Sequence, residues 1–426
     1  FKGKNATIHE IGKALNVRSV LEGSVRRVGN RVRITAQLVN AADDFHIWSQ
    51  DYDREIADIF AVQDEIAHAI TKELTGRLLP AAGTGSTPAK PKINPDAYSA
   101  YLQGRFFLAK RNKPEMMRAV AFFKQAIALE PNYADAYAGL GSTYELLFSN
   151  GQSTNTLPLA TDAIATALRL DPNHFQALTV RAELAQDSLD WRAAEAGFRQ
   201  VLELNPNDPN ALHFYEGLFQ SLGLWEAALA VERLAVALDP LAPILRENIG
   251  DDLRSLNRNA EAAIEFRAAL ALDPNFVFAL SGLCQADADL GKIDEAKKTL
   301  SRLIAVDGED GRYSLRCRPI IASQNGDLAE LNRVTTIAAR QYASGNIRTA
   351  DVAPTFAFAG DFEQAIRWFE KAYDERDILL FGYITGPDLP TKLKADPRWK
   401  AFMQRPLMKE WQAARTRVAA ELGPGK

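Results

Sequence analysis

A sequence pattern that predicts two helices recurs along the chain after residue 96. Each copy contains two stretches with apolar positions at helical spacing, separated by a turn such as Gly223-Leu224. Short markers of the form Leu-Asn/Asp-Pro close the copies at residues 204–206, 238–240 and 272–274, at intervals of 34 residues. Proline breaks a helix interior and disfavours helical geometry in the residue before it, so each marker ends a helix. The pattern predicts a tandem array of helix hairpins.

Small residues recur at the positions where two helices of a hairpin must cross closely. Gly250, Ala262, Phe266 and Ala269 carry this pattern in one copy. These residues resemble the tetratricopeptide repeat, and the resemblance implies a mainly α fold in which hairpins stack into a right-handed superhelical solenoid. We expect about eight units over residues 96–378. Their predicted starts are Ala100, Ala134, Phe175, Pro209, Pro243, Val277, Arg312 and Asn346.

Two units depart from the regular pattern. The second unit is longer by seven residues, which fall at residues 149–155 and predict a longer hairpin loop, either a tolerated surface insertion or a loop that contacts a partner. The seventh unit has Pro319 inside its expected first helix, which predicts a kink or a late helix start.

A small α/β module is expected before the repeats, over residues 1–79. A helix at residues 8–15 precedes strand patterns at 18–27, 31–39 and 46–52, and an amphipathic helix follows from about residue 58. Residues 17–27, 31–39 and 58–67 resemble the TolB-like amino-terminal domain of bacterial proteins. Three strands make a thin core, so we expect its first strands to precede residue 1. Residues 80–95 contain four prolines and predict a linker.

Composition and motifs argue against an enzyme within this segment. The chain has 50 basic and 54 acidic residues, a balance that favours neither nucleic acid nor anionic membrane as a partner. Gly83-Thr84-Gly85-Ser86 lacks the lysine of a phosphate-binding loop, and the five histidines are isolated in sequence. Cys284 and Cys317 lie 33 residues apart without a CxxC motif, so we predict neither a disulfide nor a zinc site. We expect no catalytic residue, cofactor or metal.

The resemblance also implies a partner-binding surface, because the first helix of each tetratricopeptide unit lines a concave groove. The inward positions are mostly acidic, with Arg254 as the single cation counted among them, and no carboxylate-binding clamp is present. We therefore expect a basic or neutral peptide, or a partner domain, in this groove; the alternative is that the carboxylates only keep the surface soluble. The candidate residues are Asp135, Glu145, Glu183, Asp187, His213, Glu247, Asp251, Arg254, Phe278, Gln285 and Asp289.

Residues 379–426 are expected to form a helical cap, since an open array must cover its last apolar face. Trp399, Phe402 and Trp411 are the candidates for this packing. In proteins with TolB-like and tetratricopeptide regions, this pair commonly follows a nucleotide cyclase or a winged-helix domain. The resemblance thus implies an interaction scaffold or accessory sensory region of a bacterial signalling or regulatory protein. The sequence leaves its compartment open between bacterial cytoplasm and periplasm, with a membrane tether before residue 1 as a further alternative. The alternative is the regulatory half of an adenylate cyclase or of a winged-helix transcription regulator, whose catalytic or DNA-binding domain would precede residue 1.

Overall fold

The computed structural model describes residues 7–15, 17–29, 31–55, 65, 66, 69, 93–149, 155–387 and 389–422. The chain divides into two compact units. The first contains residues 1–103 and 122–133, and the second contains residues 104–121 and 134–426. Among the described residues, no helix has the length and apolar character needed to cross a membrane.

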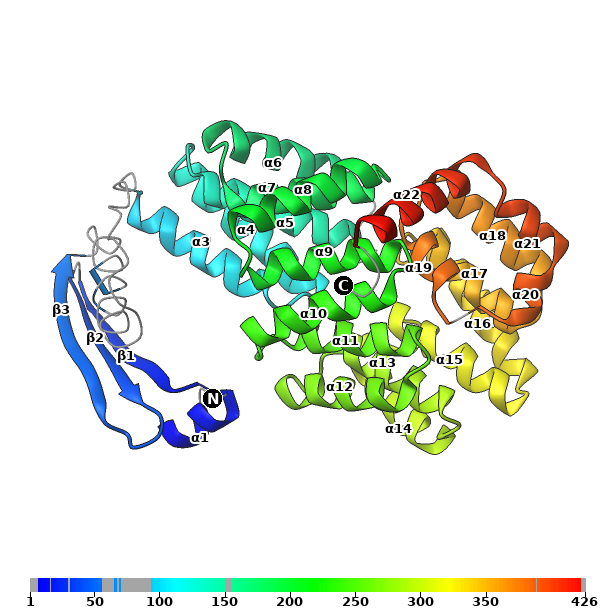
Figure 1. The fold of residues 1–426 in the computed structure, drawn as a ribbon, viewed down its shortest axis with the longest axis horizontal. Coiled ribbons are helices and arrows are strands. Elements are labelled where there is room, and N and C mark those ends of the chain that lie inside the picture. The colour runs from blue at the N-terminus through cyan, green and yellow to red at the C-terminus, as the bar shows by residue number, and fades with distance from the viewer. Residues whose placement is uncertain are drawn as a thin grey trace. The chain divides into compact units, whose positions relative to one another are not determined.

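The first unit contains a short helix and a three-stranded antiparallel sheet in the order β1-β2-β3 (Figure 1). Its elements are α1 (Ile8–Leu15), β1 (Ser19–Val28), β2 (Arg31–Asn40) and β3 (His46–Glu55). Val32, Ala36 and Leu38 of the central strand are buried, as their alternating spacing predicts, and Ala36 packs with Tyr52 of β3. Most of the helix expected from residue 58 and most of the linker lie outside the described residues. The TolB-like assignment stays a prediction.

The chain from residue 95 onward is helical, and its consecutive helices pair as hairpins from α5 with α6 to α17 with α18 (Figure 1). Their bounds are α3 (Pro95–Leu108), α4 (Lys113–Leu129), α5 (Ala134–Ser149), α6 (Leu157–Leu170), α7 (Phe175–Asp187), α8 (Trp191–Leu204), α9 (Pro209–Ser221), α10 (Trp225–Leu238), α11 (Pro243–Ser255), α12 (Asn259–Leu272), α13 (Val277–Asp289), α14 (Ile293–Asp307), α15 (Arg312–Asn325), α16 (Leu328–Ala343), α17 (Thr349–Phe358), α18 (Phe362–Asp374), α19 (Leu379–Thr385), α20 (Thr391–Ala395), α21 (Pro397–Phe402) and α22 (Pro406–Leu422).

Local sequence explains where the hairpin helices begin. The starts of α5, α7, α9, α11, α13 and α15 are the residues predicted from the repeat period, whereas α3 and α17 begin a few residues away from their predicted starts. Pro209 occupies the first turn of α9, where its missing N–H costs nothing, and the Asp208 carboxylate accepts a hydrogen bond from the Ala211 N–H at 2.8 Å. At this boundary, residues adjacent in sequence therefore fix where the helix begins.

Close helix crossing explains the small residues of the pattern. A Cβ atom placed on Gly250 of α11 would lie 2.5 Å from a ring carbon of Phe266 on α12, and one on Gly141 of α5 would lie 2.6 Å from Ile164 of α6. Phe266 is itself fully buried. The aromatic ring thus fills the space that glycine leaves.

The seventh hairpin is complete. Helix α15 begins at Arg312 and continues through Pro319, so the late start suggested by that proline is wrong. Gly326 ends the helix in the left-handed region, with φ of 65°, and the Asp327 side chain caps α16. The insertion in the second unit falls largely on residues 150–154, which lie outside the described residues.

The two cysteines form a disulfide, which corrects the prediction that they would stay unpaired. Cys284 on α13 and Cys317 on α15 are both fully buried, and their Cα atoms lie 6.1 Å apart. Their separation of 33 residues is close to one repeat period, and the first helices of consecutive hairpins pack side by side. The separation of about one repeat therefore places the two cysteines on adjacent helices, within bonding distance.

The C-terminal helices close the second unit on itself, whereas the sequence predicted an open array with a terminal cap. Trp399 and Phe402 cover Phe369 of α18, as a cap would, with ring centroids 5.2 and 6.5 Å away. Trp411 of α22, however, donates a hydrogen bond from Nε1 to the Ser221 carbonyl of α9 at 2.9 Å. One apolar cluster therefore joins helices α7–α10 to helices α17–α22.

Candidate ligand-binding cavity

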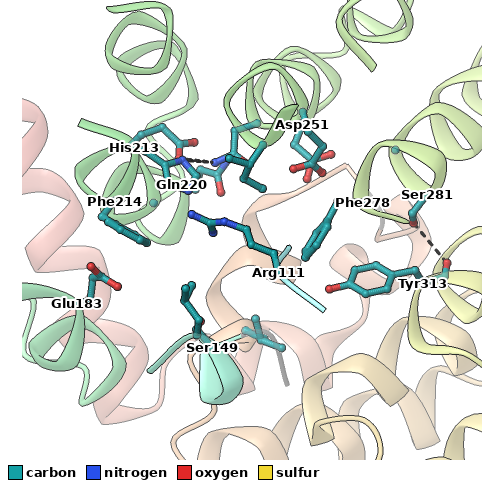
Figure 2. A pocket seen from close by; sticks show the side chains of 18 of the residues that line it. Arg111, Ser149, Glu183, His213, Phe214, Gln220, Asp251, Phe278, Ser281 and Tyr313 are labelled. Atoms are coloured by element: carbon teal, nitrogen blue, oxygen red, sulfur yellow. Dashed lines mark hydrogen bonds between the residues drawn. The ribbon is translucent and has the colours of Figure 1, made fainter. Parts of the chain in front are cut away.

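The first helices of six successive hairpins surround a cavity of about 270 Å³ within the second unit. Side chains from α5, α7, α9, α11, α13 and α15 line it, together with Arg111 from the turn before α4 (Figure 2). The second helices of the hairpins supply none of these lining residues. The cavity is therefore the enclosed counterpart of the concave groove predicted from the repeats.

Most of the candidate residues line this cavity. They are Glu145, Glu183, Asp187, His213, Glu247, Asp251, Phe278 and Gln285. The aromatic ring of Phe278 packs beside Tyr313, with centroids 5.0 Å apart. The recurrence of inward-facing positions on the first helix of each repeat brings these residues together, although they span 140 residues of sequence.

Three candidates lie elsewhere. Asp135 contacts His174, with Oδ1 at 3.3 Å from Nε2, and is outside the cavity lining. Asp289 forms an ion pair of 2.8 Å with Arg254, and Arg254 lines an adjoining cavity of about 300 Å³ instead. Asp187 and Asp251 line both cavities, so the two spaces are neighbours.

The cavity contains three arginines that the sequence analysis missed, so Arg254 is not the single inward cation. Arg111 belongs to a turn, and Arg312 and Arg316 belong to the seventh hairpin, which the groove positions had not included. The four-residue spacing of Arg312 and Arg316 places them on one helix face and could have indicated their role. Glu216 of α9 was missed as well.

Arg111 extends into the cavity with Phe214 and Phe278 on either side (Figure 2). Its guanidinium carbon lies 6.0 Å from the centre of the Phe214 ring, within range of a cation–π interaction. Arg111 itself has a positive φ of 51°, an uncommon backbone conformation for a residue other than glycine. The turn thus places the Arg111 guanidinium near the carboxyl groups that line the cavity.

Burial raises the pKa of several cavity carboxyls well above the usual range. For Glu183 the largest cause is loss of solvent, and the nearby Glu145 and Asp187 raise its pKa further, while Arg111 partly offsets them. Burial and neighbouring acids also raise the pKa of Asp187, Glu216 and Glu247. A cation that enters this cavity would favour the ionised forms.

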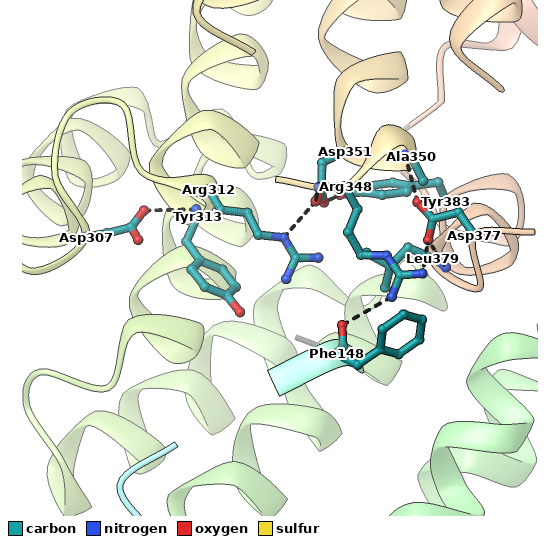
Figure 3. A network of polar contacts seen from close by, with 10 residues as sticks. All are labelled: Phe148, Asp307, Arg312, Tyr313, Arg348, Ala350, Asp351, Asp377, Leu379 and Tyr383. Carbon is teal, nitrogen blue, oxygen red and sulfur yellow. Dashed lines mark hydrogen bonds and ion pairs between the residues drawn. The ribbon is translucent and has the colours of Figure 1, made fainter. Parts of the chain in front are cut away.

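A buried network of ion pairs fixes the arginine side of the cavity (Figure 3). Arg312 Nε lies 2.9 Å from Asp351 Oδ2, and the Tyr383 hydroxyl donates to Asp351 Oδ1 at 2.7 Å. Burial opposes ionisation of Asp351, but Arg312, the Tyr383 hydroxyl and Arg316 together outweigh it and lower the pKa of that carboxyl. The network thereby joins α15, α17 and α19.

A second ion pair carries the network to the end of α5. Arg348 Nη2 lies 2.6 Å from Asp377 Oδ1, and its Nη1 donates to the Phe148 carbonyl at 3.3 Å (Figure 3). Phe148 and Arg348 are 200 residues apart in sequence. This contact links the end of α5 to the start of α17.

Comparisons with known proteins identify the repeat. A profile of the tetratricopeptide repeat family matches residues 253–316. The chain is 35% identical over 173 residues to a Rhizobium meliloti (strain 1021) protein named "Putative adenylate cyclase 3", a match that covers 39% of this chain and 29% of the relative. The chain therefore spans less than a third of the length of that relative.

Solved structures give matches of low sequence identity. Pseudomonas aeruginosa PilF is 21% identical, with a TM-score of 0.39, over 49% of this chain and 92% of PilF. The human IFIT1 dimer with PPP-AAAA is 14% identical, with a TM-score of 0.47, over 76% of this chain and 82% of that protein. From the family profile and the regular hairpins, this chain contains tetratricopeptide repeats.

Proposed function

We propose that this chain is a protein-interaction scaffold whose cavity receives a basic side chain from a partner peptide. Tetratricopeptide repeats imply protein–protein interaction, and the cavity supplies the chemistry of recognition. The observation that carries the proposal is the position of Arg111, whose guanidinium extends among six carboxyl side chains of the lining. The six carboxyl side chains outnumber the three arginines of the lining, and carboxylates bind guanidinium and ammonium groups through charge-assisted hydrogen bonds.

Cavity size argues for one inserted side chain rather than a whole folded segment. About 270 Å³ is at the lower end of the volumes that accommodate small ligands. Phe214 and Phe278 offer apolar surface for the methylene groups of lysine or arginine, and the carboxyls offer acceptors for the charged end. The rest of the peptide would lie along neighbouring first helices.

Fluorescence polarisation with peptide pools tests this proposal. Fluorescein-labelled octapeptide pools would carry lysine, arginine, norleucine or glutamate at one fixed central position. We expect the lysine and arginine pools to bind more tightly than the norleucine pool, and the glutamate pool to bind least. Binding of the basic pools should weaken on Glu183→Gln combined with Glu247→Gln, because both carboxyls line the cavity.

The matched control is Glu203→Gln on the outer helix α8, where the side chain is exposed. This variant should bind the basic pools like the unmodified chain. Equal binding of all four pools, or unchanged binding by the Glu183 and Glu247 double variant, would contradict the proposal.

A regulatory role beside a catalytic domain is the second candidate, favoured by the relative named as an adenylate cyclase. In this version the present segment is non-catalytic and senses a partner for a cyclase domain elsewhere in a longer protein. Cyclase assays of the natural full-length product, with the cavity intact or carrying Glu183→Gln and Glu247→Gln, test it. The purified segment alone should show no turnover of ATP, and cyclic AMP formation by it would refute the non-enzymatic assignment.

A further inference from the structure

A buried cluster of His213, Glu216 and Glu232 lies beside the cavity, between α9 and α10. His213 and Glu216 are three residues apart on α9 and therefore share one helix face. Glu232 comes from α10, the other helix of the same hairpin. One potential ligand atom from each side chain lies within 4.8 Å of the other two.

The three side chains are almost completely removed from solvent. Glu216 and Glu232 have no exposed surface, and His213 is 6% exposed. Glu216 Oε1 and Glu232 Oε2 are buried and find no hydrogen-bond donor among the described residues. Buried carboxylate oxygens without donors are costly, so this cluster calls for a further cation or for bound protons.

The contacts of His213 Nδ1 favour a cation. Glu232 Oε1 lies 3.0 Å from this nitrogen, and Asn248 Nδ2 lies 3.2 Å from it. If Nδ1 carries a proton, it can donate to Glu232 but faces the amide donor of Asn248. If Nδ1 carries a lone pair, it can accept from Asn248 but faces the carboxylate oxygen of Glu232.

Rotating the Asn248 amide does not resolve this conflict. Asn248 Nδ2 also donates to Glu216 Oε2 at 2.9 Å, and the exchange of its two ends would place the amide oxygen against that carboxylate. A metal ion removes the clash between Nδ1 and Glu232, because the lone pair of Nδ1 and Glu232 Oε1 would both point at the ion, while the Asn248 amide keeps its hydrogen bond to Glu216. Ligand atoms bound at about 2.1 Å lie about 3.0–3.4 Å from each other around a zinc ion. The 3.0 Å between His213 Nδ1 and Glu232 Oε1 matches this spacing, and the ligand atoms of the whole cluster lie within 4.8 Å of one another.

We propose that His213, Glu216 and Glu232 bind a divalent first-row transition-metal ion of the zinc class. One imidazole and two carboxylates suit such an ion, whereas Mg²⁺ and Ca²⁺ prefer oxygen ligands alone. His213 and Glu216 also line the cavity, so a fourth coordination position faces that space and can take water or a donor atom of a bound ligand. Asn248 orients Glu216 from the neighbouring hairpin.

The isolated histidines had led us to predict no metal site. Glu232 is 19 residues from His213 in sequence, without a recognisable metal-binding motif. Only the pairing of α9 with α10 brings its carboxylate to the imidazole. The site does not depend on the peptide proposal, because its ligands and its test differ.

Isothermal titration of the untagged chain, stripped with EDTA and kept under non-reducing conditions, tests the proposal with ZnCl2. We expect one zinc ion per chain and a higher thermal midpoint, with no such response to MgCl2 or CaCl2. His213→Gln and Glu232→Gln should each weaken zinc binding by about 100-fold or more. Glu247→Gln, a cavity carboxyl outside the cluster, and His46→Gln, a histidine of the sheet, should bind zinc like the unmodified chain.

Zinc-edge X-ray absorption of the unmodified chain provides a readout that does not depend on variant folding. It should show one imidazole with oxygen ligands and no sulfur. Absence of zinc binding, zinc binding that survives both ligand substitutions, or a sulfur-containing ligand set overturns the assignment. In the first case, bound protons rather than a metal stabilise the buried carboxyls.

Discussion

Trp411 tests whether the C-terminal helix closes the array or only caps its last repeat. The side chain is 3% exposed, its ring packs against Phe381 of α19 at 5.8 Å, and its Nε1 donates to the Ser221 carbonyl at 2.9 Å. Ser221 ends α9, so this hydrogen bond satisfies a carbonyl that the helix itself leaves unpaired. Replacement of Trp411 by alanine removes both the packing and the bond.

The expected cost follows from these contacts. Truncation of a buried tryptophan to alanine costs about 3–5 kcal/mol. Trp411→Phe keeps an aromatic ring but loses the hydrogen bond, so we expect about 1–2 kcal/mol for that change. The difference between the two variants separates packing from hydrogen bonding.

Urea unfolding combined with hydrogen–deuterium exchange measures both the size and the location of the effect. Trp411→Ala should lower the free energy of unfolding and increase amide exchange in α8 and α9, which belong to the third and fourth hairpins. Trp399→Ala is the matched control, because Trp399 is equally buried but packs on Phe369 and Phe402 near the C-terminus. It should lower stability and leave exchange in α8 and α9 unchanged.

The closure argument fails if Trp411→Ala lowers stability by the expected amount while α8 and α9 exchange as in the unmodified chain. In that case the tryptophan would stabilise only the C-terminal helices. Identical exchange patterns in the Trp411→Ala and Trp399→Ala variants would also refute closure by Trp411.

Three further predictions concern the cavity, a helix crossing and the disulfide. Burial raises the Glu183 pKa, so its stabilising contribution is complete below the ordinary carboxyl pKa and is lost as pH rises through the raised value; Glu183→Gln should therefore raise the thermal midpoint more at pH 8 than at pH 5, and parallel pH curves would contradict this. Gly250→Ala should cost about 1–3 kcal/mol in chemical denaturation because its Cβ meets a buried ring. Gly217→Ala, whose Cβ has its nearest neighbour at 4.0 Å, should be neutral or stabilising, and equal losses for both would refute the crossing argument. The joint replacement of Cys284 and Cys317 by serine should cost about 3–4 kcal/mol, given their separation of 33 residues, and a non-reduced digest with two free thiols would exclude the bond.

Sequence reasoning located the hairpins because their determinants are local. The starts of α9 and α11 were correct because a proline in the first turn marks each one. Pro319 allowed a late helix start from its own geometry, yet α15 begins at Arg312 and continues through this residue, with buried side chains around it. Rules that consider only neighbouring residues in the sequence could not account for this tertiary packing.

The candidate site was predictable only where it follows the repeat period. Glu183 and Glu247 occupy recurring inward positions and line the cavity as expected. Arg111 enters from a turn, and Glu232 reaches His213 from a second helix, so no period connects either residue with the others. The sequence analysis therefore predicted neither the arginines of the cavity nor the proposed metal cluster.

The sequence by itself determined that this chain is a series of tetratricopeptide hairpins with an acidic set of inward positions, because capping, proline placement and helical periodicity act over a few residues. The tertiary structure alone decided that the array closes on itself, that Cys284 meets Cys317, and that arginines join the carboxyls in one cavity. Contacts such as Trp411 with Ser221, 190 residues apart, depend on the accumulated curvature of many repeats. No pattern within a single repeat specifies this accumulated curvature.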